Sequence, residues 1–146
     1  MDFMKGEIRG RETREIIIID EAMIKNRVFV SIPIAGKPIK LPFPNYVDYF
    51  IMKVVSARAS DIRDIASPIC ENGIPENLVE RVKQVLPYQE IFLIKLGERI
   101  IPEIRRKTFL NSWRGIFGTI KYDEKDKKKV IIELEELIKS KNNFLS

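Results

Sequence analysis

The sequence predicts an α+β domain in which a small antiparallel β-sheet is followed by a set of helices. The 146 residues are 45% hydrophobic and 32% charged, which suits a single domain spanning residues 1–146. Apolar residues alternate with a period of two in residues 27–34, and near residue 44 the pattern changes to helical spacing. The change of period therefore divides the domain into a β-sheet portion at residues 15–41 and a helical portion at residues 45–141.

The sheet portion contains three candidate strands. Residues 1–14 show no periodicity and are interpreted as a loosely ordered lead-in. Residues 15–20 form a short β-branched run, which is typical of a strand covered on both faces inside a sheet. Residues 27–34 alternate as a second strand, and after a turn at residues 35–37 the chain returns at residues 38–41.

The helical portion begins where Asn45 offers an N-cap. We expect one helix from residue 46 to about residue 66, because Pro68 disfavours helical backbone just before it. Pro102 is expected to break or kink the chain, and Asp123 is expected to cap the last helix. Further helices are expected over residues 78–86, 88–101 and 103–113.

Composition excludes several kinds of site. Histidine is absent and Cys70 is the only cysteine, so an ordinary zinc site, a Ser-His-Asp triad, a Cys-His dyad and an internal disulfide are excluded. No metal site is expected, and any catalysis must use carboxylates, lysine and arginine. The sequence shows neither a leader peptide nor an apolar run of about 20 residues, which indicates a cytoplasmic protein without a membrane span. Its 24 isoleucines and two glutamines resemble the composition of proteins from hot-growing organisms.

Polar residues form a pattern within residues 45–65, NYVDYFIMKVVSARASDIRDI. On a single helix, Lys53, Asp61 and Asp64 share one face with Ala57 and Ser60. Arg58 lies three residues before Asp61, so an ion pair within the helix is geometrically available. From its spacing alone, the pattern indicates a solvent-exposed face with local pairs.

A hairpin, a proline-containing stop and this helix together resemble the segment after the catalytic sheet in small nucleotidyltransferases, the AbiEii-like proteins of the polymerase-β-type superfamily. In that family a comparable helix carries an apolar run, a lysine, a small residue with an arginine, and Asp-x-x-Asp. The corresponding residues here are Lys53, Ala57, Arg58, Asp61 and Asp64. The resemblance covers about residues 15–73 and implies a nucleotidyltransferase-like fold. It also implies that Lys53, Arg58, Asp61 and Asp64 contact a nucleotide or a partner.

The sequence departs from that family at the catalytic motif. Members that transfer nucleotides carry a Gly-Ser turn and an Asp-x-Asp whose carboxylates hold two Mg²⁺ ions, and this sequence contains neither. Asp20 is the position that could correspond to the family's third carboxylate, and it is the catalytic candidate. Because Asp20 alone cannot hold a metal pair, the resemblance implies that the catalytic lobe was lost, lies outside this chain or is supplied by a partner. We expect no cofactor for this chain alone, and Mg²⁺ only if a complete site is assembled.

Two other functions remain open. The net charge of +5 permits a polyanionic partner, and residues 99–114 contain five basic residues against one glutamate. In a small nucleic-acid-binding module, Trp113 would stack on a base. Alternatively, Trp113 anchors its helix to the core. A structural subunit that forms a homo-oligomer is the third alternative. If the chain is instead the nucleic-acid-binding module, its contacts with nucleic acid would be Arg105, Arg106, Lys107, Trp113 and Arg114.

Overall fold

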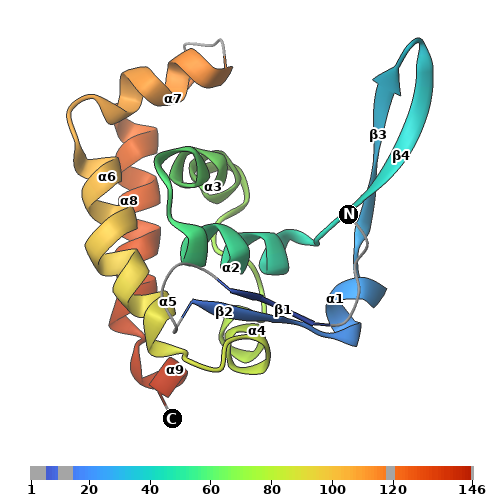
Figure 1. The fold of residues 1–146 in the computed structure, drawn as a ribbon. Coiled ribbons are helices and arrows are strands. Elements are labelled where there is room, and N and C mark those ends of the chain that lie inside the picture. The colour runs from blue at the N-terminus through green and yellow to red at the C-terminus, as the bar shows by residue number, and fades with distance from the viewer. Residues whose placement is uncertain (1–5, 10–14, 118–120, 146) are drawn as a thin grey trace.

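The computed structural model describes residues 6–9, 15–117 and 121–145, and its architecture is α+β as predicted (Figure 1). The strands come first along the chain, and the helices that follow enclose an apolar core. Within the described part of the chain, no helix is long and apolar enough to cross a membrane.

The strands form two separate antiparallel pairs instead of the single sheet that we expected. Strand β1 (Gly6–Arg9) pairs with β2 (Ile16–Ile19), and β3 (Val28–Ile34) pairs with β4 (Lys37–Phe43). Helix α1 (Glu21–Lys25) lies between the two pairs in sequence.

Two details of the β1–β2 pair correct the sequence interpretation. Residues 6–9, assigned to a loosely ordered lead-in, form a strand with Gly6 opposite Ile19. Strand β2 was expected inside a sheet, but among the described residues it pairs with β1 alone. Its isoleucine run is explained by packing, since Ile16 and Ile17 are buried whereas Ile18 is exposed. A continuous apolar run therefore does not distinguish a central strand from an edge strand packed on helices.

Strands β3 and β4 form a projecting hairpin, which we call the arm (residues 28–43). Its turn consists of Ala35 and Gly36, with φ angles of 50° and 76°, as in a type I′ turn. Figure 1 shows the arm extending away from the helices. Every residue of β3 and β4 is exposed or only partly buried.

The helix predicted from residue 46 to residue 66 is two helices, α2 (Tyr46–Ser56) and α3 (Ala59–Asn72). The break occurs at Ala57, which adopts the left-handed conformation with φ 49° and ψ 32°. The predicted stop near Pro68 is wrong, because α3 continues through Pro68 to Asn72. Local proline chemistry is overridden here because Ile65, Ala66 and Ile69 are all buried in the core.

The remaining helices follow the predicted order with altered boundaries. Helix α4 (Leu78–Val85) matches the prediction closely. Helix α5 (Glu90–Lys95) continues through a π-helical segment, η1 (Leu96–Ile100), into α6 (Ile101–Arg105), so Pro102 does not break the helix. Pro102 has no N–H to donate, and it sits in the first turn of α6 after this wider π turn.

The last three helices along the chain contribute residues to the same core. They are α7 (Phe109–Phe117), α8 (Glu124–Lys139) and α9 (Asn142–Leu145). Asp123 caps α8 as predicted, because its carboxylate accepts hydrogen bonds from the backbone N–H groups of Lys125 and Asp126. Aromatic rings join the helices, for example Phe92 stacked on Phe144 with 5.6 Å between ring centroids.

Candidate functional site

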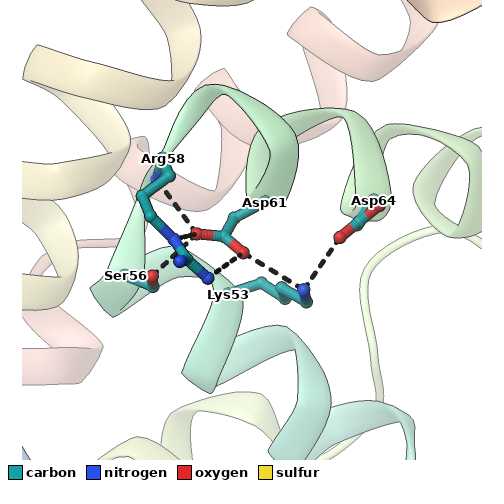
Figure 2. Close-up of polar contacts among 5 residues, drawn as sticks. All are labelled: Lys53, Ser56, Arg58, Asp61 and Asp64. Carbon is teal, nitrogen blue, oxygen red and sulfur yellow. Dashed lines mark hydrogen bonds and ion pairs between the residues drawn. The ribbon is translucent and has the colours of Figure 1, made fainter. Parts of the chain in front are cut away.

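The four residues that were predicted to contact a nucleotide or a partner converge where α2 ends and α3 begins (Figure 2). Lys53 comes from the last turn of α2, Arg58 is the N-cap of α3, and Asp61 and Asp64 lie in the first two turns of α3. The left-handed backbone at Ala57 turns α3 back so that Asp61 faces Lys53. The cluster is therefore formed across a turn between two helices, and not on one helical face as the sequence analysis expected.

Asp61 is the centre of this cluster, and its side chain is only 1% exposed. Its Oδ2 accepts hydrogen bonds from Ser56 Oγ at 2.7 Å and from Arg58 Nε at 2.8 Å, and its Oδ1 accepts one from Lys53 Nζ at 3.1 Å. Oδ2 also accepts the backbone N–H of Arg58 at 3.1 Å, which closes a capping box. Both oxygens of this carboxylate are thus occupied by partners from the same chain.

Charge and burial act in opposite directions on Asp61. Burial raises the pKa of this carboxyl group. The hydrogen bonds from Arg58, Ser56 and Lys53 lower the pKa by more than burial raises it, so the pKa falls to about 2. The position at the N-terminus of α3 also favours a negative charge. Asp61 is therefore ionised at neutral pH.

Lys53 links Asp61 to Asp64. Its ammonium group donates to Asp64 Oδ2 at 2.8 Å as well as to Asp61. Burial lowers the pKa of Lys53, yet the two carboxylates raise it more, and the net change is upward. Asp64 is 37% exposed and the Arg58 side chain is 74% exposed, so these two residues form the solvent-facing edge of the cluster.

Asp20, the catalytic candidate, belongs to a different cluster. Its carboxylate accepts the backbone N–H of Met23 at 2.9 Å, which makes Asp20 the N-cap of α1. The same carboxylate accepts Arg81 NH1 at 2.9 Å and NH2 at 3.1 Å. The hydrogen bond from Arg81 is the largest cause of the lowered pKa of Asp20. These partners assign Asp20 to capping and ion pairing, and a guanidinium at this carboxylate opposes the approach of a metal cation.

Arg81 also binds Asp48, a residue that the sequence analysis did not single out. Its Nε and NH2 donate to Asp48 Oδ1 at 3.0 and 2.9 Å. Asp48 is 1% exposed, and its Oδ2 is buried without a hydrogen-bond partner in the described structure. One arginine on α4 therefore joins the first turn of α2 to the start of α1. A signal was present in the sequence, because Asp48 lies on the apolar stripe of Ile51 and Val55, where a carboxylate needs a partner.

Within the basic segment at residues 99–114, the structure places Trp113 in the core. Trp113 is fully buried, its indole N–H donates to Ser67 Oγ at 2.9 Å, and its ring stacks on Tyr122. The proposed stacking of Trp113 on a base is therefore wrong, and the alternative that Trp113 anchors its helix is confirmed.

Three of the five basic side chains of this segment have partners within the chain. Arg105 pairs with Glu135, Arg106 pairs with Glu103 at 3.2 Å, and Arg114 Nε donates to the backbone carbonyl of Tyr122. Lys107 is exposed. Two of the five basic side chains, Arg105 and Arg106, are thus paired with carboxylates.

Neither of the two carboxylate clusters includes a third metal-ligating residue. In the part of the chain that the structure describes, no group of three or more His, Cys, Asp or Glu side chains is arranged to hold a metal ion. Cys70 is buried, and its thiol donates to Asp126 Oδ1 at 3.4 Å.

Comparison with protein-family models, with curated proteins and with solved structures found no match to this chain.

Proposed function

We propose that this chain is a nucleotidyltransferase-like domain that lacks its own metal-binding catalytic motif and acts as a binding or partner-dependent subunit. The observation that carries the proposal is the convergence of Lys53, Arg58, Asp61 and Asp64 into one network at the turn between α2 and α3. These are the residues on which the resemblance rests. Their contact in space supports a common role for the motif.

The exposed edge of the network is where a nucleotide or a partner would bind. Asp61 is saturated by contacts within the chain, so it holds Lys53 and Arg58 in place. The guanidinium of Arg58 donates hydrogen bonds from Nε and NH2 to the Asp61 carboxylate, yet the Arg58 side chain is still largely exposed. Asp64, on the same helix, is also partly exposed. Arg58 and Asp64 would therefore make the external contact, while Asp61 and Lys53 position them.

A transfer assay tests the dependence on a partner. The chain is incubated with Mg²⁺ or Mn²⁺ and labelled nucleoside triphosphates, alone and together with any polypeptide encoded beside it that is found to carry the Gly-Ser turn and Asp-x-Asp. We expect labelled product only from the mixture, because two metal ions need carboxylates that this chain does not provide. Metal-dependent transfer by the chain alone that disappears in Asp20→Ala would contradict the proposal.

A pair of variants tests the assigned edge. Arg58→Ala should reduce transfer by the mixture, whereas Arg99→Ala removes an exposed arginine of η1 and should leave it unchanged. Because Arg58 is largely exposed, its removal is expected to cost less than about 1 kcal/mol of stability. A large fall in the melting temperature of Arg58→Ala would instead assign Arg58 to the fold.

A further inference from the structure

The arm and the residues that lead into it carry an unbalanced positive charge. From residue 22 to residue 47 the sequence contains four basic residues and no acidic residue. In the described structure none of the four forms an ion pair with a carboxylate, in contrast to Arg105 and Arg106 in the helical segment. The guanidinium of Arg27 lies 5.2 Å from the ring centre of Phe29. The four residues are Lys25, Arg27, Lys37 and Lys40.

The arm also exposes apolar side chains beside these cations. Because successive residues of a strand point to opposite faces, one face carries the alternate residues of β3 from Val28 to Ile34 and those of β4 from Lys37 to Phe43. All of these except Lys37 are apolar. Phe29, on the opposite face, is 58% exposed. Apolar side chains that stay exposed on an isolated two-stranded hairpin add little to its stability. An exposed apolar face of this kind therefore marks a binding surface.

Prolines restrict which kind of partner fits the arm. The two-residue turn makes Ile34 and Lys37 a hydrogen-bonded pair, so the alternate pairs Pro33–Pro38 and Phe29–Pro42 point their backbone N atoms outward. Proline has no N–H at these outward positions. Both outer edges are therefore protected against an added strand, and β4 most of all. The arm is built to remain a two-stranded ribbon.

We propose that the arm binds double-helical DNA by lying in a groove. Lys37 and Lys40 of the arm, together with Lys25 and Arg27 at its base, would contact the phosphates, and the apolar side chains of the arm would lie against the sugars and base edges. The major groove, about 12 Å wide, admits a two-stranded ribbon. Apolar and proline side chains also contact DNA in the minor groove. Strands of seven residues reach about 23 Å, or roughly seven base pairs. Charge distinguishes this partner from a second copy of the chain, since two arms would bring like charges together.

Salt dependence measures the phosphate contacts. If all four cations contact phosphates, the log–log slope of affinity against salt is about −3.6, so raising salt from 50 to 200 mM weakens binding about 150-fold. The probe is a fluorescently labelled 20-base-pair duplex, and binding is measured by anisotropy with the full chain.

A charge-matched pair of double variants locates the contacts. Lys37→Gln with Lys40→Gln should halve the slope to about −1.8, which leaves about a 12-fold loss over the same salt range. Arg106→Gln with Lys107→Gln removes the same charge from another exposed region and should leave the slope unchanged. Equal slopes in both double variants would overturn the proposal, because binding would then follow net charge and not the arm.

A third variant tests the apolar contacts with DNA, and one further measurement tests whether the arm binds a second copy of the chain instead. Ile34→Ser should lower affinity at every salt concentration without changing the slope, since it removes an apolar contact and no charge. Circular dichroism confirms that each variant is folded, which is expected because the arm lies outside the core. Absence of duplex binding at 50 mM salt would overturn the proposal. A dimer in sedimentation equilibrium that Ile34→Ser dissociates would also overturn it, and would assign the arm to a contact with a second copy of the chain.

Discussion

Replacing Asp61 with asparagine should destabilise the protein by about 2 kcal/mol at neutral pH. The pKa of Asp61 is lowered from 3.8 to about 2, and each unit of difference between the folded and unfolded states corresponds to about 1.4 kcal/mol. The side chain is almost completely buried, so solvent screening reduces this contribution little. Asparagine keeps the shape of the side chain but removes the charge that holds Lys53 and Arg58.

The pH dependence has a definite sign. Because the pKa of Asp61 is lower in the folded state than in the unfolded state, its stabilisation is fully present above about pH 4 and is lost as the pH falls toward 2. Asparagine does not titrate in this range. The difference in stability between the wild type and Asp61→Asn should therefore shrink from about 2 kcal/mol toward zero between pH 5 and pH 2.

Urea denaturation followed by circular dichroism at several pH values checks this result. Asp64→Asn is the matched control, because Asp64 binds the same lysine but is 37% exposed and should contribute less than about 1 kcal/mol. Thermal melts at pH 7 should show a decrease of roughly 4–8 °C for Asp61→Asn. A difference in stability that stays constant with pH, or equal losses in the two variants, would refute the role assigned to the Asp61 carboxylate.

Three further substitutions test the fold. Trp113→Ala should cost about 3–5 kcal/mol in urea denaturation, because the fully buried ring packs between Phe109 and Tyr122; a loss below 1 kcal/mol would contradict its place in the core. Arg81→Met should cost a comparable amount by leaving the buried Asp48 carboxylate unpaired, and adding Asp48→Leu should restore much of that stability. Ala35→Asn should stabilise the arm by about 1 kcal/mol, since Asn-Gly is the preferred type I′ turn; hydrogen exchange of β3 amides measures this, and lower protection would contradict the turn assignment.

Features of the fold that depend on neighbouring residues could be predicted from the sequence. Asn45 and Asp123 cap helices as expected because a cap bonds to N–H groups only two or three residues away. The arm was predictable for a similar reason, since alternation and a Gly-containing turn are local signals. Its exposure was not, because alternation identifies an apolar face without showing what covers it.

Features that depend on distant residues could not be predicted. Ala57 adopts the left-handed conformation although alanine does not favour it, and the cost of about 1–2 kcal/mol is offset by the contacts of Asp61 across the turn. The two carboxylate partners of Arg81 lie 33 and 61 residues away in sequence. The four residues of the cluster contact one another, but a helix wheel placed them on one face because the break at Ala57 leaves no local signal.

The two ends of the arm are fixed by the same side chain. Asp20 caps α1, the helix immediately before β3, and Asp48 lies in the first turn of α2, the helix immediately after β4. Arg81 binds both carboxylates, so α4 holds the chain on either side of the arm while the arm itself makes little contact with the body. A projecting ribbon can be directed at a partner only if its base is immobile. The partly buried Asp20–Arg81–Asp48 cluster supplies that base, which accounts for an ionic cluster where apolar packing would stabilise the fold equally well.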